Sequence, residues 1–154
     1  MDGFFDETGH ASFEPRDIAF VLLSHAHIDH SGLLPRLMAR GFGGQVYATR
    51  ATCELLGVML PDSGYLQEKE AEREGETPLY TALQARNCLE RLQAVDYDEE
   101  VRPHPSVRCR WRDAGHILGS AILEIRLGKT KLVFSGDLGQ PGHPVVEDPA
   151  PIED

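Results

Sequence analysis

The sequence predicts a single α/β domain, and three observations support this prediction. Strand and helix signals alternate over the first half of the chain, and short strand signals dominate the second half. The chain has 154 residues, of which 41% are hydrophobic, so it can bury a core. This order of elements is typical of a sheet packed against helices.

The first elements are predicted from apolar runs and helix-end signals. The apolar run Ile18–Leu23 predicts a strand that is buried on both faces. A short helix is predicted over Gly32–Arg40, with Ser31 as its N-cap and Gly41 at its end. A short strand, Gln45–Ala48, follows.

Two helices are predicted in the middle of the chain. The first begins near Arg50, is expected to break at Pro61 and continues to Arg73. The second is capped by Thr81 and is expected to reach Leu92.

Three strands and an irregular tail complete the chain. The strands are predicted over Val107–Arg112, Ala121–Leu127 and Lys131–Ser135. The tail, Gln140–Asp154, contains four prolines and shows no periodicity. The second half therefore supplies a sheet without a covering helix of its own, although an apolar sheet face needs a covering layer.

A dense group of potential metal ligands follows the Ile18–Leu23 strand. His25 and His27 are two residues apart, so in an extended chain they point to the same side and can hold one cation. Asp29 and His30 follow where the chain turns into a helix, so they can face a second cation. Functional sites are common where strands of an α/β sheet end. A chance run of polar loop residues explains such a concentration of ligands poorly.

Two later segments offer one further ligand each. His116 lies between small residues in the segment Asp113–Ser120, and Asp137 follows an apolar strand in the segment Ser135–Gly139. Each segment alone is equally compatible with a simple turn. Together with the upstream cluster, both indicate a metal site.

These motifs resemble those of a known family. The His-x-His-x-Asp-His motif and the later Gly-His and Gly-Asp pairs are similar to the ligand motifs of the metallo-β-lactamase superfamily. Segments similar to its β-CASP branch, which contains RNA-processing nucleases, are Phe13–Pro15, Leu60–Ser63 leading into Gln67–Glu72, and Asp113–Ser120. The resemblance extends from about Phe13 to Pro149.

The resemblance implies a role for each ligand. His25, His27 and His116 would hold a first zinc ion, Asp29 and His30 a second, and Asp137 would bridge both ions. Manganese or iron are the alternative metals. Asp29 would also be the catalytic residue that orients or deprotonates a water molecule.

The resemblance also implies a fold and an activity. Residues 1–154 are expected to form part of an αββα metallo-β-lactamase sandwich, because family members have further strands before this region and a β-CASP insertion and a last histidine ligand after it. The implied function is zinc-dependent phosphodiester hydrolysis of RNA. The isolated chain is expected to be a weakly active or inactive fragment that self-associates.

Two rival functions stay open beside RNA hydrolysis. The net charge is −10, which weighs against RNA binding through a broad basic surface. One rival is a metal-binding or interaction module without catalysis, and the other is a small ester or thioester hydrolase of the same superfamily.

Other sequence features concern the cellular compartment and the remaining histidines and cysteines. No apolar run is long enough for a membrane span, and the three cysteines are scattered, which predicts reduced thiols in a cytoplasmic protein. His10, His104 and His143 are interpreted as loop histidines. Cys53 and Cys88 are predicted to be buried thiols, and Trp111 is predicted to pack in the core.

Overall fold

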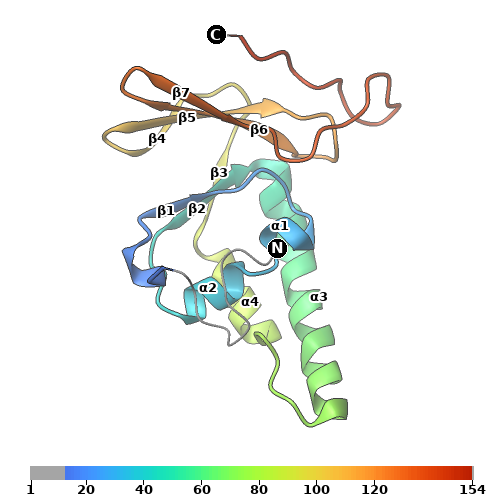
Figure 1. Cartoon of the computed structure of the whole chain (residues 1–154). Coiled ribbons are helices and arrows are strands. Elements are labelled where there is room, and N and C mark those ends of the chain that lie inside the picture. Colours follow the sequence, from blue (N-terminus) through green and yellow to red (C-terminus); the bar gives the residue numbers. More distant parts are fainter. Residues whose placement is uncertain (1–12, 154) are drawn as a thin grey trace.

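The computed structural model describes residues 13–153, which form two sheets and one layer of helices (Figure 1). The strands of the first sheet are β1 (Phe20–Leu22), β2 (Gln45–Thr49) and β3 (Leu92–Val95). Those of the second sheet are β4 (Val101–His104), β5 (Val107–Asp113), β6 (Ala121–Leu127) and β7 (Thr130–Phe134). The helices are a 3-10 turn, η1 (Pro15–Asp17), and α1 (Ile28–Ser31), α2 (Leu34–Ala39), α3 (Arg50–Glu74) and α4 (Ala82–Leu89).

The two sheets differ in strand direction. The first has the order β1-β2-β3 and is parallel, so each connection crosses over through helices: α1 and α2, then α3 and α4. The second has the order β4-β5-β6-β7 and is antiparallel, with strands joined by short connections. The prediction of an α/β fold is confirmed.

The parallel sheet is the middle layer of three. Helices α2, α3 and α4 lie on one side of it and the antiparallel sheet on the other (Figure 1). Side chains alternate along β2: Val46 and Ala48 join the core beneath the helices, whereas Tyr47 packs into the core between the sheets. Within residues 13–153 the arrangement is therefore β–β–α, which is three of the four layers of an αββα sandwich.

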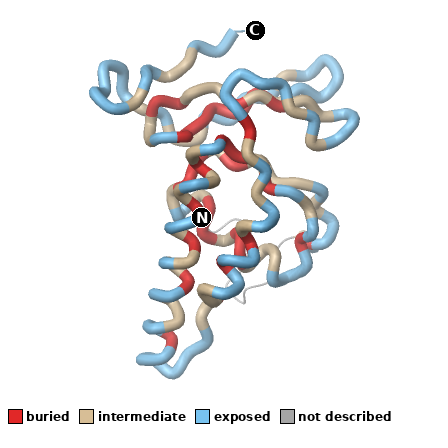
Figure 2. The backbone as a smooth tube through the Cα atoms, turned by 180° about the vertical axis from the view of Figure 1, so that it is seen from behind, coloured by how far each residue is buried: buried red, intermediate tan, exposed pale blue. Residues whose placement is uncertain are grey.

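Burial follows these layers. In Figure 2 the buried backbone is concentrated where the two sheets and the helices meet, whereas the C-terminal tail is largely exposed. Trp111, on β5, is completely buried between the sheets, and its indole Nε1 donates to the carbonyl oxygen of Leu23 at 3.0 Å. The prediction that Trp111 packs in the core is confirmed.

The predicted first strand is shorter and more exposed than expected. β1 covers only Phe20–Leu22, and each of these residues is half-buried. The reason is that β1 pairs with β2 alone among the described residues, so it forms an edge of the sheet.

The predicted break at Pro61 is wrong, because α3 runs through it as one helix. Leu56, Leu60 and Gly64 are buried on both sides of the proline, and Leu56 and Leu60 belong to the core under the parallel sheet. Gly57, whose carbonyl loses the N–H of residue 61, is exposed to water. Packing and hydration together therefore compensate for the proline.

Two helix limits also differ from the predictions. Ser31 is the last residue of α1 rather than an N-cap, and its hydroxyl lies 2.9 Å from the carbonyl oxygens of Ala26 and His27. Thr81 does cap α4 through a capping box with Gln84, but the helix ends at Leu89. After the helix, the chain forms strands β3 (Leu92–Val95) and β4 (Val101–His104), and the sequence analysis predicted neither of them.

Candidate metal centre

The end of β1 is fixed by backbone contacts to both sheets. The N–H of Leu23 donates to Tyr47 of β2 at 2.9 Å, and the carbonyl oxygen of Ser24 accepts from Ala121 of β6 at 2.8 Å. His25 and His27 follow directly, and His27 is the N-cap residue of α1. Both histidines therefore start from a backbone that two sheets hold in place.

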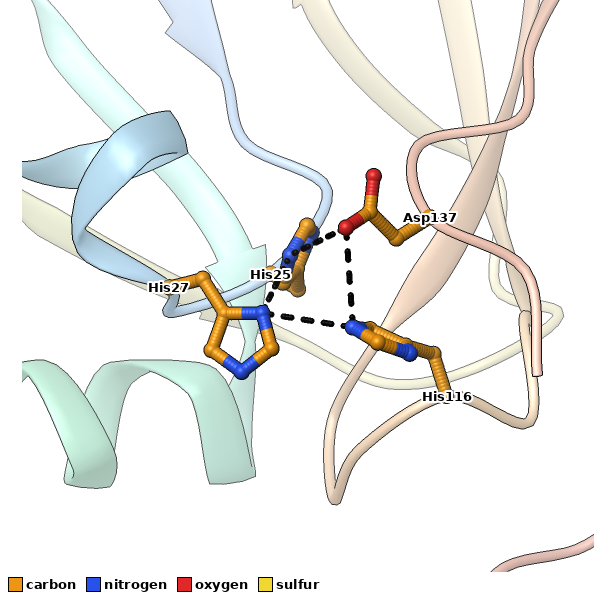
Figure 3. Close-up of side chains that lie close together, drawn as sticks. All are labelled: His25, His27, His116 and Asp137. Carbon is orange, nitrogen blue, oxygen red and sulfur yellow. Dashed lines mark hydrogen bonds and ion pairs between the residues drawn. The ribbon is translucent and has the colours of Figure 1, made fainter.

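Three imidazole nitrogens meet at this point. Nδ1 of His27 lies 3.1 Å from Nε2 of His25 and 3.2 Å from Nε2 of His116, which comes from the loop between β5 and β6 (Figure 3). His25 is completely buried, whereas His27 and His116 are half-buried.

Asp137 closes this group from the segment after β7. Its Oδ2 lies 3.8 Å from Nε2 of His25 and 3.6 Å from Nε2 of His116 (Figure 3). One ligand atom from each of the four residues lies within 4.8 Å of every other. The close approach depends on Gly136, because a Cβ at this position, which has φ +54°, would lie 2.8 Å from Cβ of Ser24.

The two separations at His27 fit a tetrahedral cation. A Zn–N distance of about 2.0–2.1 Å gives neighbouring nitrogens roughly 3.3 Å apart in a tetrahedron, close to the separations around His27. Direct hydrogen bonds between the histidines explain these short distances less well. Nδ1 of His27 has either one proton or one lone pair, so it can form only one direct hydrogen bond although two ring nitrogens approach it.

The second predicted group is more open. Nε2 of His30 lies 3.3 Å from Oδ1 of Asp137 and 3.5 Å from Oδ2 of Asp29. Asp137 therefore presents Oδ2 to the three-histidine group and Oδ1 to His30. The side chain of Asp29 is 72% exposed and that of His30 is 32% exposed. Asp29 is not among the four residues whose ligand atoms converge.

Electrostatics favour a neutral imidazole at His25. Burial, followed by repulsion from His30, lowers the pKa of His25 from 6.5 to about 4, although Asp137 opposes this shift. Ser24 Oγ lies 3.1 Å from Nδ1 of His25. When Nδ1 donates to this hydroxyl, the lone pair of Nε2 is directed at the other ligands, as metal coordination requires. The sequence analysis did not single out Ser24.

The other candidate residues lie elsewhere. His143 is exposed in the tail, where its Nδ1 accepts from the N–H of Val145, and His104 is exposed on β4 rather than in a loop. Cys88 is buried as predicted and Cys53 is half-buried. His10 lies outside the described residues.

A comparison with known families agrees with this arrangement. Residues 3–153 match the Metallo-beta-lactamase superfamily. The chain belongs to this superfamily. Membership confirms the family predicted from the ligand motifs, and it fits a mixed α/β fold with one parallel and one antiparallel sheet.

The chain is similar to several known proteins, and two of them have names that refer to RNA cleavage or to transcription. The chain is 35% identical over 138 residues to ribonuclease TTHA0252 from Thermus thermophilus, which covers 90% of this chain and 30% of that protein. It is 34% identical over 128 residues to transcription termination factor FttA from Methanocaldococcus jannaschii, covering 82% and 20% respectively. Integrator complex subunit 11 from Danio rerio is 28% identical over 118 residues, covering 76% and 19%. The chain thus spans less than a third of each of these relatives.

A solved structure supports the superfamily fold. A Cronobacter sakazakii metallo-β-lactamase with a mutated HARLDQ motif aligns with a TM-score of 0.54 at 21% identity, covering 88% of this chain and 47% of that one. At this identity the likeness concerns the fold alone.

Proposed function

We propose that this chain provides the metal centre of a β-CASP-type nuclease that hydrolyses phosphodiester bonds in RNA with two zinc ions. The observation that carries the proposal is the convergence of His25, His27, His116 and Asp137, with His30 on the other oxygen of Asp137. The names of the relatives, a ribonuclease among them, support RNA as the substrate.

The ligand set divides into two groups that share one carboxylate. His25, His27 and His116 would hold the first ion, and Asp29 and His30 the second, with Asp137 contributing one oxygen to each. Ions held by these residues would supply Lewis acidity, both toward a water molecule whose pKa they would lower and toward the phosphate oxygens of a phosphodiester.

The protein groups then have separate tasks. The buried His25 remains neutral near pH 7 and therefore donates a lone pair without first losing a proton. Asp29 has the most exposed side chain of these ligands, so solvent can reach it, and we assign it the role of orienting and deprotonating the attacking water.

The negative net charge of the chain affects the way in which we propose that RNA is bound. At −10 the chain has no general attraction for polyanions, so we assign phosphate recognition to the metal centre rather than to a broad basic surface. The same charge favours the second candidate function, a metal-binding or interaction module without catalysis.

A small phosphodiester separates these candidates. The 154-residue chain, loaded with zinc or manganese, is incubated with bis(p-nitrophenyl) phosphate, whose hydrolysis needs no extended RNA-binding surface. We expect hydrolysis that stops on chelation and is absent in His25→Ala/His27→Ala. The carboxylic ester p-nitrophenyl acetate tests the small-ester rival, which predicts the opposite substrate preference. Metal binding without hydrolysis of either substrate would favour the non-catalytic module.

Single-stranded RNA is the second substrate. We expect cleavage by this chain to be weak. It spans less than a third of the RNA-related proteins that it resembles, and its net charge is acidic, which disfavours RNA binding. RNA cleavage at an ordinary enzymatic rate, on the order of 1 per second or more, would contradict this expectation.

We further propose that the chain self-associates through β7. Leu132, Val133 and Phe134 are 40%, 45% and 55% exposed on a strand that pairs only with β6 in the described part of the chain. Sedimentation analysis should detect association that Phe134→Lys reduces. A wild-type chain that stays monomeric over the whole concentration range would refute this.

The cellular compartment is also a proposal. No helix within residues 13–153 is long and apolar enough to cross a membrane. Cys53, Cys88 and Cys109 are all free thiols. The thiols support a reducing compartment such as the cytoplasm, which localisation of the tagged protein would test.

A further inference from the structure

The loop that carries His116 is shaped by one buried hydroxyl group. Oγ of Ser120 accepts hydrogen bonds from the N–H groups of His116 at 3.0 Å and of Ile117 at 3.2 Å. Ser120 is completely buried, and its carbonyl oxygen accepts from the hydroxyl of Tyr97 at 2.8 Å. These contacts fix the internal shape of the loop. The next residue, Ala121, donates its N–H to the carbonyl oxygen of Ser24 at 2.8 Å, which ties the C-terminal end of the loop to the end of β1.

Two threonines at the start of α3 give the loop a second connection, closer to the middle of the loop. The hydroxyl groups of Thr49 and Thr52 both lie within donating distance of the carbonyl oxygen of Gly119, at 2.6 and 2.9 Å. Thr49 is 3% exposed and Thr52 is completely buried. A carbonyl oxygen has two lone pairs, so the pair of hydroxyls can satisfy it fully.

The loop and the helix approach each other without any side chain between them. Gly119 has φ +82°, and a Cβ there would lie 2.6 Å from the backbone nitrogen of Thr52 and 2.8 Å from Oγ1 of Thr49. Glycine is therefore required by both the backbone conformation and the contact. Because leaving a buried carbonyl without a donor is costly, the two hydroxyls hold the loop against α3.

The contact links the loop that carries His116 to the parallel sheet that leads into the other two histidines. Thr49 is the last residue of β2, which pairs directly with β1, and β1 leads into His25 and His27. Gly119 is three residues beyond His116 in the chain. The hydroxyls thus connect the β5–β6 loop to the parallel sheet. A shift of the loop by about 1 Å would spoil the 3.2 Å approach of His116 to His27.

We propose that Thr49 and Thr52 are positioning residues that set His116 against His25 and His27 before a metal ion binds. This inference rests on the metal centre proposed above. It adds residues that touch none of the predicted ligands and act only through the backbone of the loop.

Cobalt(II) binding tests the proposal, because its visible absorption reports coordination as well as affinity. The 154-residue chain is titrated with Co²⁺ as wild type, Thr52→Val and Thr52→Ser. Valine keeps the shape of threonine but cannot donate to Gly119, whereas serine keeps the hydroxyl. We expect Thr52→Val to bind at least about 10-fold more weakly, with weaker ligand-field bands, as for the loss of a group that orients a ligand. Thr52→Ser should resemble wild type.

Thr81→Val is the matched control. It removes the hydroxyl of another helix-capping threonine, at the start of α4, and should lower the melting temperature without affecting the metal ligands. Its cobalt affinity and spectrum should equal those of wild type. An equal loss of affinity in Thr81→Val and Thr52→Val would assign the effect to general stability and overturn the proposal.

The remaining outcomes are also decisive. Wild-type affinity and spectrum in Thr52→Val would overturn the positioning role and leave the metal centre intact. A wild-type chain that binds no cobalt would overturn the metal centre and this inference with it. If circular dichroism shows that Thr52→Val does not fold, Thr52→Ala removes the same donor without the added methyl group and is expected to show the same loss.

Discussion

The two halves of the metal centre are built differently. The half formed by His25, His27 and His116 is enclosed: its nitrogens lie 3.1 and 3.2 Å apart, and His25 has no exposed surface. The half formed by Asp29 and His30 is open, with 72% and 32% of these side chains exposed. Asp137 faces both.

The difference suggests a division of labour. An enclosed set of imidazole nitrogens favours tight metal binding, whereas an exposed carboxylate remains accessible to water. The enclosed half also receives its support from three separate elements, β1, the β5–β6 loop and α3, whereas Asp29 and His30 lie together on α1.

The largest effect is expected from removing the enclosed half. His25→Ala/His27→Ala should bring the zinc content of protein purified without chelator down to background, because only His116 and Asp137 remain of the four converging ligands. Elemental analysis of the purified protein measures this. Zinc content equal to wild type would mean that the metal binds elsewhere.

The open half should affect hydrolysis more than metal content. Asp29→Ala should lower the rate on bis(p-nitrophenyl) phosphate at least about 10²-fold, because it removes the group assigned to the water proton, while zinc remains in the enclosed half. His143→Ala, in the exposed tail, is the control and should retain wild-type activity. The reverse ranking would show that the catalytic role is assigned to the wrong residue.

Metal should stabilise the fold through the enclosed half. Zinc at 100 times its dissociation constant should raise the free energy of unfolding by about 2.7 kcal/mol. The single tryptophan, Trp111, is buried between the sheets and reports unfolding by fluorescence. An unchanged melting temperature would indicate that zinc binds the folded and unfolded chains equally. His143→Ala should show the wild-type increase.

The smallest effect concerns protons at His25 in metal-free protein. Because folding lowers the pKa of His25 from 6.5 to about 4, the unfolded chain binds the extra proton first as the pH falls through 6.5. Stability should therefore fall between pH 6.5 and about 4, by on the order of 2 kcal/mol from pH 7 to pH 5 at this residue. Denaturant unfolding with chelator measures it. The His25→Gln variant should not show the loss of unfolding free energy that is due to His25. If its stability depends on pH as much as that of wild type, the effect does not come from His25.

The fold was predicted well where the sequence signal is local. The strands β5, β6 and β7 and the cap at Thr81 follow the predicted limits closely, because alternation and capping depend on neighbouring residues. β3 was missed because four residues after a helix carry little signal of their own, and their pairing with β2 makes them a strand. The break at Pro61 was wrong because packing of Leu56 and Leu60 outweighs the local preference of proline.

The sequence by itself determined the superfamily and the chemical kind of the ligands, because four of the six occur within one short motif and imidazole and carboxylate chemistry does not depend on the fold. Whether these residues bind metal stays a prediction. Only the tertiary structure decided which ligand atoms meet, since His116 and Asp137 reach His25 across long stretches of chain through the pairing of β6 with Ser24. It also decided the roles inferred for Ser24, Thr49 and Thr52. These are ordinary hydroxyl residues in the sequence, and they gain their significance from burial, where a hydroxyl group must find a partner and so fixes whatever it contacts.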